Sequence, residues 1–392
     1  MAQNGNPGPR PNQPRPRALL AIILVLLALV IGIGSIAAYF VLNHTQQGGG
    51  PPPPPRQTAT ATAGVGNGGG GGGGSCNQNS PYGFTTVHAD TQLVSIYKQL
   101  NVCWVRYQIH WWDKNKKGGI EKTQGVRDWS KVDAAVTAMN AAGIHIDFPI
   151  QQAPPWDQAQ KCNGTPFLPG PDQMTDFATE IATRYNGHNG HGYIDAFEIG
   201  NEEYDNFFIP GEGAASLACR SASYYGPVLR AGYEAIKKAS PNALVGMFGM
   251  WYHNLPHIQD FMTYLYSNDY GKYMDYMNFH YYNDSGDPAV SQGERPSFDT
   301  WWQTMHNIAT KYGFANKPIW VTETGWPNQN PQSQDQHLQY IMGQAANSHI
   351  IQKVFWFTVN YGSQSKNIDP PSGPLPAFST FQKLVQQKPR WG

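Results

Sequence analysis

Three carboxylates follow two apolar runs of the sequence, in positions where they could act together. The run ending FEIGNEEY places Glu202 and Glu203 directly after Asn201, and the run ending IWVTETGWP contains Glu323. Two carboxylates facing each other could divide the work, one donating a proton to a leaving oxygen and the other attacking carbon. Cleavage of a glycosidic bond needs this division, by direct attack at a carboxyl separation of about 5–5.5 Å or through water at about 6.5–9.5 Å.

Such a pair requires strands that end on the same side of the fold. Residues 76–392 alternate short apolar, β-branched or aromatic runs with amphipathic segments, which is typical of parallel βαβ units. The strands that we predict are 82–87, 102–109, 144–150, 194–199, 244–248, 276–280, 319–322 and 354–358. The helices that we predict lie near 91–100, 130–143, 173–186, 221–239, 256–268, 299–312, 334–347 and 377–386.

The helix near 130–143 carries the clearest local signals. Ser130 and Asp133 have the spacing of a capping box, and Gly143 is placed to end the helix. Between them, one helical face is apolar, formed by Val132, Ala135, Val136 and Met139.

Eight successive βα units predict a (β/α)8 TIM barrel. The alternative is an open doubly wound sheet. We disfavour it because no Gly-rich phosphate loop follows the first strand, and because polar residues cluster after many strands instead of one switch point. In a barrel the carboxyl ends of all strands meet at one face, so the ends of the fourth and seventh strands would bring the carboxylates together.

The region resembles the large clan of glycoside hydrolases that carry catalytic glutamates after strands four and seven, including cellulase-like, β-xylosidase-like and β-1,3-glucanase-like families. The resemblance covers the whole predicted barrel. In that clan an Asn precedes the acid/base glutamate, which matches Asn201 and Glu202, and the nucleophile closes strand seven, which matches Glu323. The resemblance implies that Glu202 is the acid/base, that Glu323 is the nucleophile, and that the configuration of the sugar is retained.

Other positions of the clan match single residues of this sequence. Arg106 in WVRYQIHWW corresponds to an arginine that bonds the nucleophile, where its charge would keep that carboxylate ionised. His280 and Tyr282 in FHYYND match a His-x-Tyr pattern, with Tyr282 donating to the nucleophile and His280 orienting substrate or acid/base. Trp356 matches a tryptophan that forms the base of the sugar-binding site in the clan. Asn201 would form a hydrogen bond with the 2-hydroxyl of the sugar.

The sequence departs from the clan after the acid/base position, where Glu203 stands in place of a frequent proline. Alternation along the strand does not decide between Glu202 and Glu203, and we assign the role to Glu202 because of Asn201. ETGWP resembles the β-1,3-glucanase-like families and VRYQIHWWD the β-xylosidase-like ones. The sugar, the linkage and endo or exo action therefore stay open.

Tryptophans follow several predicted strands and would lie in loops over the same face. They are Trp111, Trp112, Trp156, Trp251 and Trp326. A pyranose ring can stack its C–H face on indole, so Trp156 and Trp326 are candidate sugar contacts, while others among the five would pack between loops. Several such contacts would fit an oligosaccharide or a polysaccharide.

The N-terminal 75 residues have a different composition. Residues 18–42 carry no charge and, as a helix, would span roughly 37 Å, more than the about 30 Å hydrocarbon core. Arg10, Arg15 and Arg17 precede this stretch, which predicts a cytoplasmic tail (1–17), a single transmembrane anchor and an extracellular catalytic domain (76–392). The alternative is a cleaved signal peptide, which we disfavour because the apolar stretch is too long and no convincing cleavage site follows it. Residues 43–75, rich in Pro, Thr and Gly, predict a flexible linker.

The four cysteines all follow the predicted anchor, where disulfides are permitted. We expect Cys162 and Cys219 to pair, because both fall in loops that we place on one barrel face. Cys103, inside a predicted strand, could equally be bonded or be a small buried residue.

Composition argues against several other functions. The formal net charge is zero, and no long run of Lys or Arg follows residue 20, so we expect no nucleic-acid partner. No His-x-His follows the first strand, where His88 stands alone, so we expect no metal and no cofactor. We expect a monomer whose partner is a carbohydrate. The alternative function is a barrel that binds glycan without cleaving it, which the presence of both glutamates disfavours.

Overall fold

The computed structural model describes residues 76–391, except for 88–90, 114–118, 158–168, 203–221, 252–254, 284–285, 293–294 and 362–364. The predicted anchor and linker, Glu203, Cys162 and Cys219 lie outside the described residues. No helix within the described part of the chain is long and apolar enough to cross a membrane.

Eight parallel strands form one sheet in the order β7-β6-β5-β2-β1-β10-β9-β8. Their bounds are β1 (Tyr82–Thr86), β2 (Trp104–Tyr107), β5 (His145–Ile150), β6 (Ala196–Ile199), β7 (Leu244–Gly246), β8 (Met277–Tyr281), β9 (Ile319–Thr324) and β10 (Ile351–Trp356). Parallel bridges from Gly246 to Tyr276 and from Met250 to Phe279 join the two outer strands. These bridges nearly close the sheet, so the predicted barrel is confirmed.

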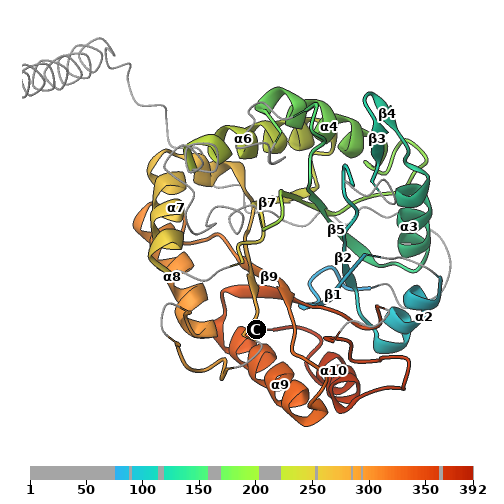
Figure 1. Ribbon diagram of the computed structural model, residues 1–392, viewed down its shortest axis with the longest axis vertical. Helices are drawn as coiled ribbons and strands as arrows, with labels where there is room; N and C mark the ends of the chain where they lie inside the picture. The colour runs from blue at the N-terminus through green and yellow to red at the C-terminus, as the bar shows by residue number, and fades with distance from the viewer. Residues whose placement is uncertain are drawn as a thin grey trace, which may run out of the picture. The chain divides into compact units, whose positions relative to one another are not determined.

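Helices surround the strands as an outer ring (Figure 1). They are α2 (Thr91–Leu100), α3 (Ser130–Ala141), α4 (Pro171–Arg184), α6 (Ala222–Ala239), α7 (Leu255–Ser267), α8 (Phe298–Lys311), α9 (Pro331–Ser348) and α10 (Pro376–Gln387), with a 3-10 turn η2 (Tyr270–Tyr273) before β8. Three of them begin at a proline, whose fixed φ suits the first helical turn and whose missing N–H is not needed there. Every predicted helix is present.

Two sequence predictions were wrong in detail. Ser130 is the first residue of α3 and caps nothing; instead Asp128 Oδ1 accepts from the Ser130 N–H at 3.1 Å and from its hydroxyl at 2.6 Å. Asp133 is held by Arg184 and Tyr185 from the next helix, so tertiary partners replace the predicted capping box. The last strand was predicted at 354–358 but spans Ile351–Trp356. The prediction missed its start because Lys353 interrupts the apolar pattern. In the structure this lysine is buried and donates to Gln78 O.

The sequence reasoning also missed a short antiparallel hairpin between β2 and α3. Its strands are β3 (Glu121–Thr123) and β4 (Val126–Arg127), with Gly125 in the left-handed conformation at the turn.

The barrel interior consists of two layers of different chemistry. The layer at the amino ends of the strands is aromatic: Tyr276 stacks on Trp320 at 3.9 Å, and the Lys353 ammonium lies 4.2 Å from the Trp104 ring. The layer at the carboxyl ends is polar and almost fully buried, with Thr85, Arg106, Asp147, Glu198, Asn278 and Thr322. Because buried charges require partners, this upper layer must be a connected network.

A disulfide joins Cys76 to Cys103 and fastens the start of the domain to the beginning of β2. Of the two alternatives for Cys103, the bond is therefore the one found. Trp104 Nε1 and Lys353 Nζ both donate to the carbonyl of Gln78, at 2.8 Å each. The segment that begins at Cys76 is thus held to the aromatic layer at the amino ends of the strands, which we call the barrel floor.

Candidate active site

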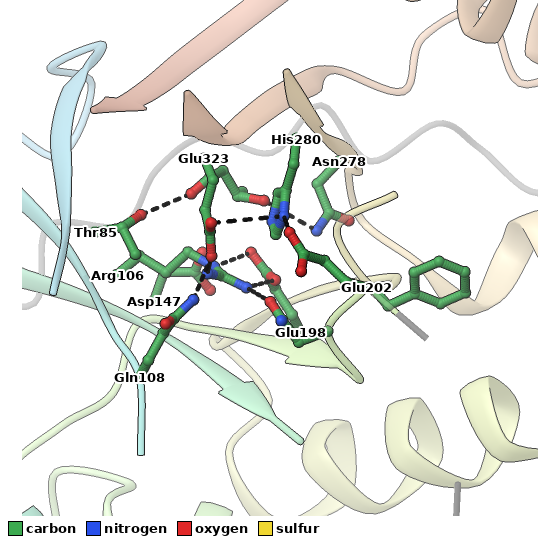
Figure 2. Close-up of polar contacts among 12 residues, drawn as sticks. Thr85, Arg106, Gln108, Asp147, Glu198, Glu202, Asn278, His280 and Glu323 are labelled. Atoms are coloured by element: carbon green, nitrogen blue, oxygen red, sulfur yellow. Dashed lines mark hydrogen bonds and ion pairs between the residues drawn. The ribbon is translucent and has the colours of Figure 1, made fainter. Parts of the chain in front are cut away.

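Arg106 lies at the centre of the polar layer and organises it (Figure 2). Its Nε and Nη2 donate to the two carboxylate oxygens of Glu198 at 2.9 and 2.7 Å, and its Nη1 donates to Glu323 Oε1 at 2.6 Å. Burial alone would lower the pKa of Arg106, but the charges of Glu198 and Glu323 outweigh burial and raise it. The guanidinium therefore stays charged.

Four groups from two strands or their ends, β2 and β8, converge on Glu323, which is 6% exposed. Besides Arg106, Gln108 donates to Oε1 and the Tyr282 hydroxyl donates to Oε2 at 2.8 Å. His280 Nδ1 lies 3.8 Å from Oε2. Burial alone would raise the pKa of Glu323, but the charges of His280 and Arg106 and the bonds from Tyr282 and Gln108 lower it below its ordinary value. Glu323 is thus an ionised carboxylate near neutral pH.

Glu202 reaches the same point from the end of β6. Its Oε1 lies 2.7 Å from His280 Nδ1, so the imidazole stands between the two glutamates. The ligand atoms of Glu202, His280 and Glu323 all lie within 4.8 Å of one another. The structure therefore brings the two predicted glutamates together.

The backbone at Glu202 has an uncommon conformation that places this side chain. Its φ is 51°, in the left-handed region, which costs about 1–3 kcal/mol in a residue other than glycine. The Glu202 N–H donates to Gly249 O at 3.2 Å, which ties the turn to the end of β7. Gly249 must itself lack a side chain, because a Cβ there would lie 2.0 Å from His280 Nε2.

Asn201 joins the network through its amide oxygen. Arg106 Nη2 donates to Asn201 Oδ1 at 2.6 Å. Because arginine only donates, the oxygen must face Arg106, and the NH2 is the end of the side chain that can donate to a sugar hydroxyl.

A second carboxyl pair lies beneath the glutamates and was not predicted. Asp147 on β5 and Glu198 on β6 are both 0% exposed. Burial, and then the charge of Glu198, raise the pKa of Asp147 well above its ordinary value. Asp147 is therefore the neutral partner, and Glu198 supplies the charge that balances Arg106.

The sequence contained features from which the roles of Asp147, Glu198 and Gln108 could have been predicted. Glu198 in AFEI and Asp147 in HIDFPI are carboxyl groups inside buried strands, which is expensive without a partner. Gln108 stands two residues after Arg106 and so points to the same side of the chain.

The predicted tryptophan contacts differ in exposure. Trp356 is 1% exposed and its indole N–H lies 3.4 Å from Lys366 O, and Trp326 is 8% exposed and stacks on His337 at 3.4 Å. Little of either side chain is exposed, and their sugar-contacting roles stay predictions. Trp156 is half-buried and keeps part of its surface exposed.

Glu202, His280 and Glu323 are also donor types that hold metal ions. A cation at Glu323 would have to compete with Arg106, which donates to this carboxylate at 2.6 Å, and would be repelled by the guanidinium charge. This arrangement fits a site that works without metal.

A family model described as "Glycosyl hydrolase catalytic core" matches residues 166–371, more than half of the chain. The chain belongs to this family. The match to the glycosyl hydrolase core includes β6, β8 and β9, and hence both glutamates, while Arg106 and Asp147 precede it. The resemblance to glycoside hydrolases proposed from the sequence is thereby confirmed.

The solved structures similar to this chain include glycoside hydrolases. A family 39 glycoside hydrolase from Bacteroides cellulosilyticus has 15% identity and a TM-score of 0.61, over 78% of this chain and 64% of that chain. A monomeric β-xylosidase from Caulobacter crescentus has 15% identity and a TM-score of 0.53, over 80% and 69%. Xylanase B from Clostridium stercorarium has 14% identity and a TM-score of 0.55, over 78% and 98%.

At these identities the similarity establishes the fold. The chain spans less than two thirds of the length of the family 39 enzyme. No curated protein matches the sequence.

Proposed function

We propose that this protein is a retaining glycoside hydrolase that cleaves β-glycosidic bonds in an extracellular poly- or oligosaccharide. The observation that carries the proposal is the pair Glu202 and Glu323, with oxygen atoms within 4.8 Å of each other. This spacing supports direct attack over attack by an intervening water, which needs carboxyl groups about 6.5–9.5 Å apart.

In the first step, Glu202 gives its proton to the glycosidic oxygen as the bond to the anomeric carbon breaks. Glu323 attacks that carbon from the opposite face and forms a glycosyl ester. Arg106, Tyr282 and Gln108 hold Glu323 ionised and aimed before the substrate arrives, which is preorganisation rather than a rearrangement made during the reaction.

In the second step, Glu202 takes a proton from water, and the resulting hydroxide equivalent displaces Glu323 from the anomeric carbon. The ester removes the charge of Glu323, so Glu202 can now hold a negative charge at lower cost. His280 lies against both carboxylates and can stabilise either charge as it develops. Two inversions at one carbon give net retention.

Substituting each glutamate by glutamine tests the assignment. Glu323→Gln should lower kcat at least about a thousandfold on any substrate that the wild type cleaves. Glu202→Gln should lower kcat about 10²- to 10⁴-fold for poor leaving groups, and added azide should partly restore turnover of activated aryl glycosides as an azide adduct. Glu234→Gln, an exposed residue of α6, is the matched control and should leave turnover unchanged.

The stereochemistry has its own test. NMR of the first product formed should show the β-anomer before mutarotation. An α-anomer would contradict the retaining mechanism, and full turnover by Glu323→Gln would contradict the nucleophile assignment.

We also propose that residues 18–42 anchor the enzyme in the membrane, with the barrel outside the cell on the linker 43–75. This proposal rests on the uncharged stretch and on the arginines that precede it. A tethered active site suits a substrate that is large and does not diffuse to the enzyme.

A further inference from the structure

Two half-buried tryptophans lie beside each other at the carboxyl ends of neighbouring strands. Trp112 follows β2 and Trp156 follows β5, and their ring centroids are 6.4 Å apart at an interplanar angle of 81°. Trp111, between Gln108 and this pair, is by contrast 1% exposed and stacks on Phe177 at 4.0 Å. The structure thus separates a packing tryptophan from two that retain exposed surface.

A buried carboxylate outside the catalytic network holds Trp156, one member of this pair. Glu121, on the β3–β4 hairpin, is 1% exposed and accepts from Trp156 Nε1 at 3.1 Å and from Trp111 Nε1 at 2.8 Å. It also accepts from Arg127 Nε at 3.0 Å and from the Gly125 N–H at 2.8 Å. Burial alone would raise the pKa of Glu121, but these bonds lower it, so an ionised group holds the Trp156 ring in its plane.

The backbone is equally constrained. The N–H groups of Trp111 and Trp112 donate to the carbonyls of Gln151 and Gln152, each at 3.0 Å, which ties the loop after β2 to the loop after β5. Glu121 N–H donates in turn to Trp111 O at 2.8 Å. The Trp156 side chain and the backbone that carries Trp112 are therefore preorganised, which lowers the entropy that binding a ligand would cost.

The pair and the catalytic groups follow the carboxyl ends of neighbouring strands. Gln108, which donates to Glu323, lies four residues before Trp112 in the same loop region. The β5 end from which Trp156 follows is bonded to the β6 end that leads to Glu202, through Gly200 N–H to Ile150 O at 2.9 Å. A chain of sugars with its scissile bond at the glutamates can extend over this side of the barrel mouth.

We propose that Trp156, held by Glu121, and the neighbouring Trp112 form a platform for a pyranose unit of the glycan beyond the unit that Glu323 attacks. The proposal rests on the proposed function and narrows its substrate to chains longer than the two sugars joined by the scissile bond. The flat C–H face of a pyranose packs on an indole, and the edge-to-face pair offers one ring face and one ring edge to it. Glu121 is a positioning residue, because it acts through Trp156.

The test is chain-length dependence in the full-length protein in detergent. Wild-type kcat/KM should rise from an aryl monoglycoside and a disaccharide to a hexasaccharide of the cleaved glycan. Trp156→Ala and Trp112→Ala should each lower kcat/KM on the hexasaccharide about tenfold, mainly through KM, and change it less than about twofold on the aryl glycoside. Trp156→Phe, which keeps an aromatic face, should restore most of the loss.

Trp302→Ala is the matched control. Trp302 is also half-buried, and its indole N–H also donates to a carboxylate, Asp299 Oδ1 at 2.9 Å, but it lies on the outer helix α8. It should leave the chain-length profile unchanged. Equal losses on short and long substrates in the Trp156 and Trp112 variants, or no loss on either, would overturn the platform.

A binding measurement separates this proposal from the catalytic one. Glu323→Gln should bind the uncleaved hexasaccharide with a change in tryptophan fluorescence, and adding Trp156→Ala to that variant should weaken binding about tenfold. If the wild type cleaves none of a panel of β-linked gluco-, xylo- and manno-hexasaccharides, the proposed function fails, while titration of the same panel still decides on the platform. Unweakened binding by the double variant would reject the platform alone.

Discussion

Tyr282 is the residue whose contribution to Glu323 can be isolated most cleanly. Burial and the charges of Glu323 and Glu202 raise its own pKa well above the ordinary value, so it stays a hydroxyl donor. Its bond at 2.8 Å stabilises the ionised form of Glu323 and is one cause of the lowered pKa of that carboxylate. Removing the bond should raise the pKa of Glu323.

Tyr282→Phe should therefore move the acidic limb of the kcat/KM profile to higher pH, by about one pH unit or more. Full pH–rate profiles of the wild type and the variant measure this. Tyr281→Phe is the control, because the Tyr281 hydroxyl donates to Pro288 O and does not reach Glu323. An unmoved limb in Tyr282→Phe would show that this bond does not tune the nucleophile.

The raised pKa of Asp147 leads to a prediction about the stability of the fold and not about the reaction rate. Its pKa in the folded protein is raised, so folding favours the protonated form, and its ionisation opposes folding at higher pH. Wild-type stability should thus fall, relative to Asp147→Asn, as pH rises above the ordinary Asp pKa of about 3.9. Urea unfolding of both proteins between pH 4 and pH 8 measures the difference, and a difference independent of pH would contradict a protonated Asp147.

At the scale of elements, the start of the domain is held to the barrel floor by covalent and polar contacts together. Cys76 and Cys103 are 27 residues apart in the sequence, and their bond encloses β1 and α2. Cross-linking a loop of this size restricts the unfolded chain.

The double variant Cys76→Ser, Cys103→Ser should lower the free energy of unfolding by about 2–4 kcal/mol. Denaturant titration with and without reductant measures it. Reductant should destabilise the wild type more than the double variant, by about the same amount, because the double variant can lose only the expected Cys162–Cys219 bond. A wild type indifferent to full reduction would contradict a stabilising bond.

The buried Lys353 on β10 leads to a second prediction about the stability of the barrel floor, namely its dependence on pH. Burial lowers its pKa to about 7, although Asp195 and Asp147 oppose that shift. Between pH 7 and the ordinary Lys pKa of about 10.4, the unfolded chain binds more protons at this position than the folded one. The contribution of Lys353 to stability therefore rises with pH across this window.

Lys353→Met removes this titration. The stability of the wild type relative to the variant should increase from pH 7 to pH 10, as measured by denaturant unfolding at each pH. A constant difference would mean that Lys353 titrates normally in the folded protein.

At the scale of the whole molecule, the proposed anchor and the barrel should be separable in function. The full chain should sediment with membranes, and a chain starting at residue 76 should remain in the supernatant. Turnover of small aryl glycosides should be the same for both within about twofold, because every contact of the catalytic network described above lies within the barrel. Full-length protein in the soluble fraction would contradict the anchor.

The sequence by itself determined the barrel and the main catalytic candidates. Periodic apolar runs report directly which side of each element is buried, so all eight strands and the helices between them could be predicted. Glu202, Glu323, Arg106, His280 and Tyr282 stand at the carboxyl ends of such runs, and barrel topology requires those ends to meet.

Only the tertiary structure decided which partners these residues have. Glu198 and Asp147 come from strands whose side-chain directions and neighbours depend on register and on closure of the ring. The cost of burying each carboxyl group is met by donors far away in the sequence, such as Arg106, 92 residues from Glu198. The same reason separates the five tryptophans: sequence places them all after strands, but burial depends on which loops pack over them.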